Sequence, residues 1–297
     1  MTVLPGLDDL LRRAPALRFP AVQAQLGASF AIVFAATLVA LLLTEAHHPF
    51  VGLLVQAVFC VLVLWIVRDF YSGPERLFPF EQALLWRQAP AWAITAASVT
   101  SVLFTRGAEA ESVVPLWVSV LTGLYLLVTA AVLGWRTLQA LGIAGLLGAT
   151  TYHPDDARRV DWEVTAIVRH PGTGAVARLI LAMGLWNGSP YALLLAVALV
   201  WIFLPAWVRL DDDEQEARLG EAQRRARIGI PALFPRGLGA EAELLAALLH
   251  APEPIDESIV PTGGGAPEPE VPERLDDADE PPAADGPAEG TGEPAEE

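Results

Sequence analysis

"YALLLAVALVWIFLPAWV", residues 191–208, is a run without any charged side chain. A helix needs about 20 apolar residues to cross the ~30 Å hydrocarbon core of a bilayer. Backbone groups inside lipid must be hydrogen-bonded within the protein, so an isolated apolar run of this length forms a helix rather than a strand. The stretch therefore predicts a transmembrane helix near the end of the folded part of the chain.

Five further runs are apolar, although the fifth, near residues 174–186, is short and contains Arg178, and the 297-residue chain is 53% hydrophobic overall. The pattern predicts an all-α fold, a polytopic helical membrane protein with about six transmembrane helices. Residues 136–150 ("RTLQALGIAGLLGAT") are too short and glycine-rich for another span, and are re-entrant, interfacial or part of a seventh helix. The predicted spans lie near residues 28–43, 50–67, 88–105, 113–135, 174–186 and 191–208.

The distribution of arginine supports this count, because all 19 basic residues are arginines. They concentrate in the N-terminal segment, the second and fourth loops and the region after the last span, whereas the odd-numbered loops contain only Arg106. Positive charge near spans favours the cytoplasmic side. We therefore expect both termini in the cytoplasm. The absence of lysine, with abundant Ala, Gly and Pro, suggests a GC-rich bacterial genome, so we expect the membrane to be a bacterial inner membrane.

The net charge of −16 comes almost entirely from the C-terminal end. Residues 252–297 contain 15 acidic residues and one arginine, a net of −14, so residues 1–251 carry only −2. Ten of the 24 prolines also lie there. Such a composition predicts a disordered acidic tail. The folded part has no basic patch outside the membrane flanks, so we expect no nucleic-acid partner.

The chain divides into four parts by these criteria. Residues 1–112 form an N-terminal membrane segment with three spans, and residues 113–236 form a second membrane domain. Residues 237–251 predict an amphipathic helix, which lies on the membrane or docks on the bundle. Residues 252–297 are the acidic tail. The leucines predicted on one side of the amphipathic helix are Leu244, Leu245, Leu248 and Leu249.

Polar residues gather at both ends of the last two spans. Arg169-His170-Pro171 precedes the fifth span, and "RLDDD", residues 209–213, follows the sixth. "WNGSP" at 186–190 predicts a tight turn between the two spans. Since a hairpin returns to the membrane face that it left, the two motifs should be neighbours. A histidine, arginines and carboxylates would then converge and could bind a charged or zwitterionic ligand.

These residues resemble the isoprenylcysteine carboxyl methyltransferase-like membrane methyltransferases. Arg169-His170-Pro171 matches their Arg-His-Pro motif, Arg209 their following arginine, and Asp211-Asp212 stand at their glutamate pair. Leu219-Gly220 and Ile230-Pro231 with Pro235 continue the register. The likeness covers roughly residues 115–236. Asn187-Gly188 also resembles the nitrite-reduction-associated NnrU-type branch of these proteins.

The resemblance implies S-adenosylmethionine as cofactor and a lipophilic small molecule or lipid as methyl acceptor. It implies that Arg209 is catalytic, holding a carboxylate of the acceptor or the cofactor. The residues implied in cofactor binding are Arg169, His170, Pro171, Asp211 and Asp212.

An alternative is a non-catalytic membrane accessory or scaffold protein that keeps this fold. Thr173, Gln223 and Ala226 stand where the family has tyrosines, and the acidic pair is one methylene shorter. Arginines at span ends can also act as interfacial anchors. We expect no metal site: His47-His48 is a turn pair, and the single cysteine, Cys60, cannot form a thiolate cluster.

Overall fold

The computed structural model describes residues 4–71, 80–105, 112, 114–148, 163–220, 224 and 228–250. The predicted all-α class is confirmed, since these residues form helices and contain no strand. The acidic tail, Arg106, Gln223 and Ala226 lie outside the described residues.

The elements are α1 (Leu7–Arg13), η1 (Pro15–Arg18), α2 (Pro20–His47), α3 (Pro49–Tyr71), α4 (Phe80–Ala83), η2 (Leu84–Gln88), α5 (Ala89–Phe104), α6 (Leu116–Leu146), α8 (Glu163–Ile167), α9 (Pro171–Asn187), α10 (Pro190–Ala198), η4 (Leu199–Phe203), α11 (Leu204–Leu219) and α13 (Gly237–Leu249).

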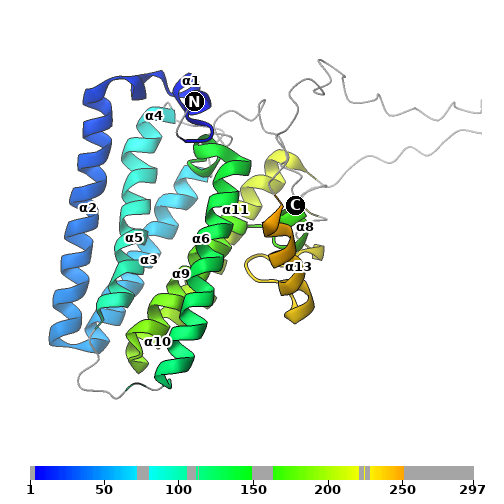
Figure 1. Ribbon diagram of the computed structural model, residues 1–297. Coiled ribbons are helices and arrows are strands. Elements are labelled where there is room, and N and C mark those ends of the chain that lie inside the picture. The colour runs from blue at the N-terminus through cyan, green and yellow to red at the C-terminus, as the bar shows by residue number, and fades with distance from the viewer. Residues whose placement is uncertain are drawn as a thin grey trace, which may run out of the picture. The chain divides into compact units, whose positions relative to one another are not determined.

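Four helices of the described chain are long and apolar enough to cross a bilayer. They are α2, α3, α6 and the continuous helix from α10 through η4 into α11, and they run side by side (Figure 1). The other two predicted spans correspond to α5 and α9, which have 16 and 17 residues. Composition therefore supports an integral membrane protein with four candidate spans.

The two shorter helices are the interior ones. Most residues of α5 are buried, and they are small, as in Ala91, Ala97 and Ser101. On α9, a Cβ atom added at Gly184 would lie 2.8 Å from the Cβ of Ala196, which shows how closely α9 approaches α10. Small residues allow such contacts between membrane helices. Interior helices need no continuous apolar surface, and both are shorter than the four candidate spans.

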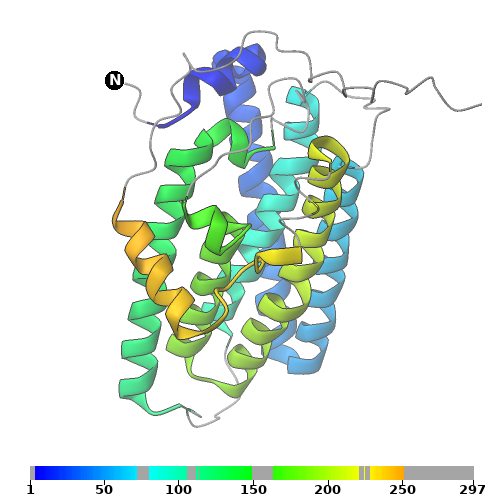
Figure 2. The ribbon, with the colours of Figure 1, turned by 90° about the vertical axis from the view of Figure 1, so that its right-hand side faces the viewer.

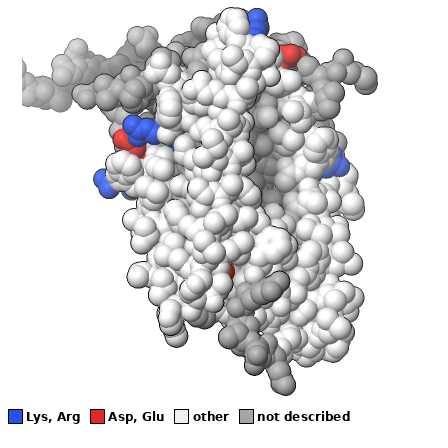
Figure 3. Space-filling view, turned by 90° about the vertical axis from the view of Figure 1, so that its left-hand side faces the viewer, with Lys and Arg blue, Asp and Glu red and all other residues white. Residues whose placement is uncertain are grey.

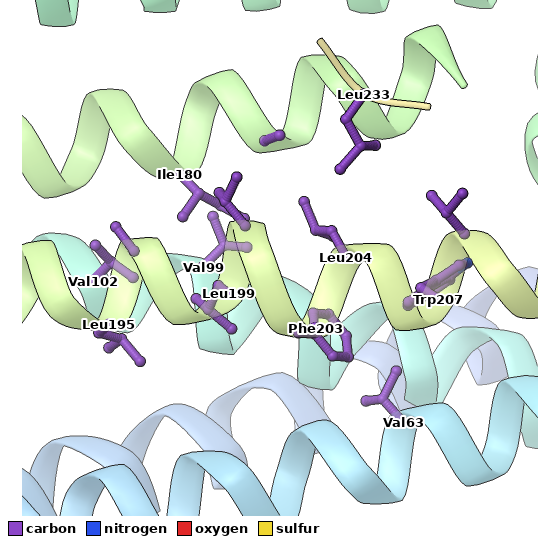
Figure 4. Close-up of a cluster of buried hydrophobic side chains, with 14 of the residues drawn as sticks. Val63, Val99, Val102, Ile180, Leu195, Leu199, Phe203, Leu204, Trp207 and Leu233 are labelled. Carbon is purple, nitrogen blue, oxygen red and sulfur yellow. The ribbon is translucent and has the colours of Figure 1, made fainter. Parts of the chain in front are cut away.

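The outward-facing helices carry the apolar surface. Large side chains such as Ile32, Phe50 and Trp65 are mostly exposed. Over the face that α2 covers, Figure 3 shows most of the coloured charges toward the upper end, and only one small acidic spot among the white residues of the lower part. Inside, the α10–α11 helix packs between α9 on one side and α3 and α5 on the other (Figure 4).

Both π-helical segments precede a proline. η2 leads into Pro90 of α5, and η4 leads into Pro205 of α11. Proline lacks an N–H and its ring clashes with the preceding turn, so a normal α-helical register cannot continue through it. A single π turn absorbs that mismatch. In α11 this keeps the helix continuous up to its acidic end.

Helix α6 extends beyond the predicted fourth span and includes most of residues 136–150. Its backbone breaks at Gly142, which has φ 65° and ψ 170°, a conformation that is essentially confined to glycine. The N-terminal chain crosses α6 there: the Ile143 N–H donates to the Pro5 carbonyl at 2.9 Å. A Cβ added at Gly6 would lie 2.8 Å from the Gly142 Cα. Two glycines thus permit the N-terminal segment to lie across the end of α6.

Candidate functional site

The turn between α9 and α10 fixes how the two arms of the hairpin face each other. Gly188 ends α9 with φ 71°, and the Ser189 hydroxyl accepts a hydrogen bond from the Ala192 N–H. The Asn187 side-chain amide donates to carbonyls at the end of α5, including that of Thr105 at 2.7 Å. Because the turn is short and tied to α5, the register of the hairpin is fixed along its whole length.

The Arg169-His170-Pro171 motif forms the N-terminal boundary of α9. His170 is the N-cap residue and Pro171 occupies the first turn, where its missing N–H costs nothing. The N–H groups of Arg169 and His170 donate to the carbonyls of Pro231 and Ala232, at 3.0 and 3.1 Å. The segment that follows α11 therefore holds the motif by its backbone, leaving the side chains to face α11.

On α11, the two aspartates receive both side chains of the motif. His170 Nε2 lies 2.9 Å from Asp212 Oδ1, and His170 Nδ1 lies 3.0 Å from Asp211 Oδ2. The Arg169 guanidinium contacts both oxygens of Asp212, at 3.0 and 3.1 Å. The structure thus brings together Arg169, His170, Asp211 and Asp212, with Pro171 beside them. We call the four charged residues the hairpin cluster.

Charge balance in the hairpin cluster keeps His170 protonated. Burial by itself would lower the pKa of His170, but the contacts with Asp211 and Asp212 outweigh it and raise the pKa to about 9. An imidazolium with both nitrogens on carboxylates is a donor, not a base, at neutral pH. The two cations and two anions of the cluster then neutralise one another, so its net charge is near zero.

Access to the cluster is uneven. Asp212 is 2% exposed, whereas the side chain of Asp211 retains 24% exposure and also accepts from Gln215 at 3.0 Å. The Arg169 Nε atom is buried and has no hydrogen-bond partner within the described part of the chain. Asp211 and Arg169 Nε are therefore the two groups with remaining capacity for a ligand.

Arg209, the residue implied in catalysis, does not join the cluster. It is exposed on α11 and makes no hydrogen bond or ion pair among the described residues. On a helix, residues 209 and 211 point to different sides, since neighbouring side chains are separated by about 100°. Its role remains a prediction.

Two partners of Asp211 were not expected from the sequence. Tyr71, at the end of α3, interacts with Asp211 and with Trp207, so the N-terminal half contributes to the site. Gln215 lies one helical turn after Asp211, and this i,i+4 spacing is a signal that the sequence did contain. No sequence pattern relates Tyr71 to α11, because the contact depends on packing between distant helices.

A second charged group is buried farther along α9. Arg178 is 1% exposed, and its Nη2 contacts both carboxylate oxygens of Glu241 on α13, at 3.0 and 3.1 Å. The Tyr125 hydroxyl of α6 donates to the same carboxylate at 2.6 Å. The ring of Phe234 lies 5.2 Å from the guanidinium carbon. Arg178 is therefore an interior residue rather than an interfacial anchor, and we call this group the α13 cluster.

Helix α13 docks on the bundle rather than lying free. Leu244, Ala247 and Leu248 are buried against Leu133 of α6, Val164 of α8 and other residues, whereas Leu249 is largely exposed. Figure 2 shows α13 alongside α6. Of the four leucines predicted on one side, Leu244 and Leu248 are buried, whereas Leu245 and Leu249 are exposed, so the buried stripe follows Leu244, Ala247 and Leu248.

Comparison of the chain with protein-family models, curated proteins and solved structures finds no match. The resemblance to the membrane methyltransferases therefore rests on the residues named above.

Proposed function

We propose that this chain is an integral membrane methyltransferase that uses S-adenosylmethionine and acts on a lipophilic small molecule or lipid. One observation carries the proposal: two motifs separated by a helical hairpin, Arg169-His170 and Asp211-Asp212, converge within hydrogen-bond distance. That convergence is what the resemblance requires of a cofactor site. The proposal includes six spans, a bacterial inner membrane and cytoplasmic termini.

The groups with remaining capacity fit the cofactor. A zwitterionic amino-acid moiety needs a donor for its carboxylate and an acceptor for its ammonium group. Among the described residues, Arg169 Nε is a buried donor without a hydrogen-bond partner, and Asp211 is a partly exposed acceptor. Charge-assisted hydrogen bonds of this type are short and directional. S-adenosylmethionine, when bound, supplies a methyl group already activated on a sulfonium.

The protein's own contribution would then be orientation and exclusion of water rather than acid–base chemistry. His170 keeps its proton because its pKa is about 9, so it would hold Asp211 and Asp212 in place and would not accept a proton from the acceptor. Asp212, almost fully buried, would fix Arg169. Arg209, exposed at the edge, would bind an anionic acceptor.

A non-catalytic accessory protein is the second candidate, and one observation favours it. The four charges of the hairpin cluster neutralise one another, so the cluster can hold α9 against α11 without a ligand. Under this alternative the chain would bind no cofactor. Thr173, at a family tyrosine position, fits the same interpretation.

The deciding experiment is calorimetric binding of S-adenosylmethionine to the purified full chain in amphipol. We expect saturable binding that Asp211→Asn reduces at least tenfold, with a cooperative thermal transition that shows the variant still folds. Arg209→Gln should bind the cofactor normally but transfer less labelled methyl to a membrane lipid extract. Absence of binding by the folded wild type would overturn the proposal and leave the accessory role.

A further inference from the structure

A cavity of about 630 Å³ lies among the N-terminal helices, outside the hairpin. Its walls come from α1, η1, α2, η2 and α5, and from Leu147 after α6. Seven of its twelve lining residues are leucines, and the others include Gly27, Phe30 and Trp92. In Figure 1, α1 lies at the same end of the bundle as α4 and the end of α6. This volume falls in the range of ~300–1,000 Å³ typical of ligand sites.

The wall of the cavity is a built part of the fold. Leu10, Leu17 and Leu84 line it and also belong to a buried cluster with Phe80 and Ala144. The contact between Gly6 and Gly142 fixes the chain that leads into α1. The cavity therefore does not depend on a loosely attached terminus.

The lining defines the chemistry of a ligand. The cavity is open on one side, and its walls offer water few hydrogen-bond partners, so it favours apolar molecules. The one amide in the lining, Gln23, already donates to the Leu17 carbonyl at 2.7 Å. The Trp92 Nε1 atom is buried and lacks a hydrogen-bond partner in the described regions. A ligand with a long hydrocarbon part matches the apolar lining, and one acceptor oxygen on it matches the Trp92 Nε1 donor.

We infer that this cavity binds the hydrocarbon chain of an acyl lipid, with a carboxyl or ester oxygen accepting from Trp92 Nε1. The site uses none of the hairpin cluster, so it stands whether or not the chain transfers methyl groups. A free fatty acid and a phospholipid offer the same chain and oxygen, and competition separates them.

Gly27 provides the variant that tests the cavity. A Cβ atom there would meet nothing within 4 Å, although Gly27 lines the cavity, so a larger side chain enters open space. Gly27→Phe should fill the cavity without displacing the backbone. Ala35→Phe, at an exposed position of the same helix, is the matched control. Gly27→Leu is a smaller filling variant.

The experiment measures binding of cis-parinaric acid, a fluorescent fatty acid, to the full chain in amphipol. We expect saturable binding with one site, at least tenfold weaker in Gly27→Phe, intermediate in Gly27→Leu and unchanged in Ala35→Phe. Trp92→Phe should weaken binding by roughly tenfold through loss of the donor. The stronger of two competitors, palmitate or phosphatidylglycerol, identifies the source of the chain. Equal binding by folded Gly27→Phe and Ala35→Phe would overturn the inference.

Discussion

Arg169 and Arg178 are two largely buried arginines in the same stretch of chain, and they obtain their counterions in different ways. Arg169 pairs with Asp212, which lies on the other arm of the same hairpin. Arg178 pairs with Glu241, which lies on α13, after the hairpin has ended. Both side chains are largely shielded from solvent, and an unpaired charge is costly in such a place. Each therefore requires a carboxylate, but only the first carboxylate has a position set by a short turn.

The two arginines therefore differ in where their carboxylate partners lie: within the same hairpin for Arg169, and on a separate helix for Arg178. In the hairpin cluster, two carboxylates on α11 serve two cations, so the charges balance within the cluster. In the α13 cluster, one carboxylate serves Arg178 and Tyr125 together, and the Arg178 Nη1 atom has no hydrogen-bond partner in the part of the chain described. The hairpin cluster thus holds two arms of one motif, whereas the α13 cluster holds a separate helix on the bundle.

The largest effect should come from Asp212→Asn. This change keeps the shape of the side chain but leaves Arg169 and His170 without their shared buried counterion. Breaking a buried pair in this way costs about 3–5 kcal/mol. We expect a lower thermal transition of the full chain in amphipol, by far more than for Asp213→Asn at the neighbouring exposed position. Similar transitions for the two variants would show that the cluster does not stabilise the fold.

In the α13 cluster, replacing one partner of the ion pair should lower stability, and replacing both should restore most of it. Glu241→Leu leaves the buried Arg178 charge uncompensated, at a cost of roughly 3 kcal/mol, whereas adding Arg178→Met removes that charge. We expect the double variant to regain most of the lost stability. Chemical unfolding of the four proteins in the cycle measures the coupling, and additive losses would contradict a paired role.

The contrast explains which parts the sequence could predict. The positions of Arg169, His170, Asp211 and Asp212 followed from apolar runs and a turn, because a hairpin needs only its length and its turn to bring its ends together. The interior position of α5 and α9 did not follow from their sequences, because an apolar run can belong to a lipid-facing or to an interior helix. The contacts of Glu241 and Tyr71 were not predictable, because they depend on how helices that are distant in the sequence pack together. No periodicity in the sequence indicates that packing.

A pH profile sharpens the comparison, because the hairpin cluster contains a titrating group and Arg178 does not titrate. The pKa of His170 is raised from 6.5 to about 9 in the folded protein. Protonated His170 therefore stabilises the fold fully below pH 6.5, and this contribution is lost as the pH rises through about 9. The thermal transition of the wild type should fall across that interval. His170→Gln should flatten the profile, and identical profiles would contradict the assigned protonation.

The smallest expected effect, Gly174→Ala, tests whether the two clusters are mechanically linked. A Cβ at Gly174 would lie 2.7 Å from the Leu233 carbonyl oxygen and 3.6 Å from Arg178 Nη1. The segment around Leu233 holds the backbone of the Arg169-His170 motif on one side and places Phe234 beside Arg178 on the other. Displacing it should disturb both clusters, at about 1–3 kcal/mol.

The control is Gly134→Ala on α6, where the added Cβ would meet only Ala175 at an ordinary 3.7 Å. Alanine favours a helix over glycine, so that variant should be neutral or more stable. A link between the clusters also predicts that Gly174→Ala reduces the pH dependence assigned to His170. If Gly174→Ala lowers stability but leaves the pH profile of the wild type intact, the segment supports α13 alone and the two clusters act independently.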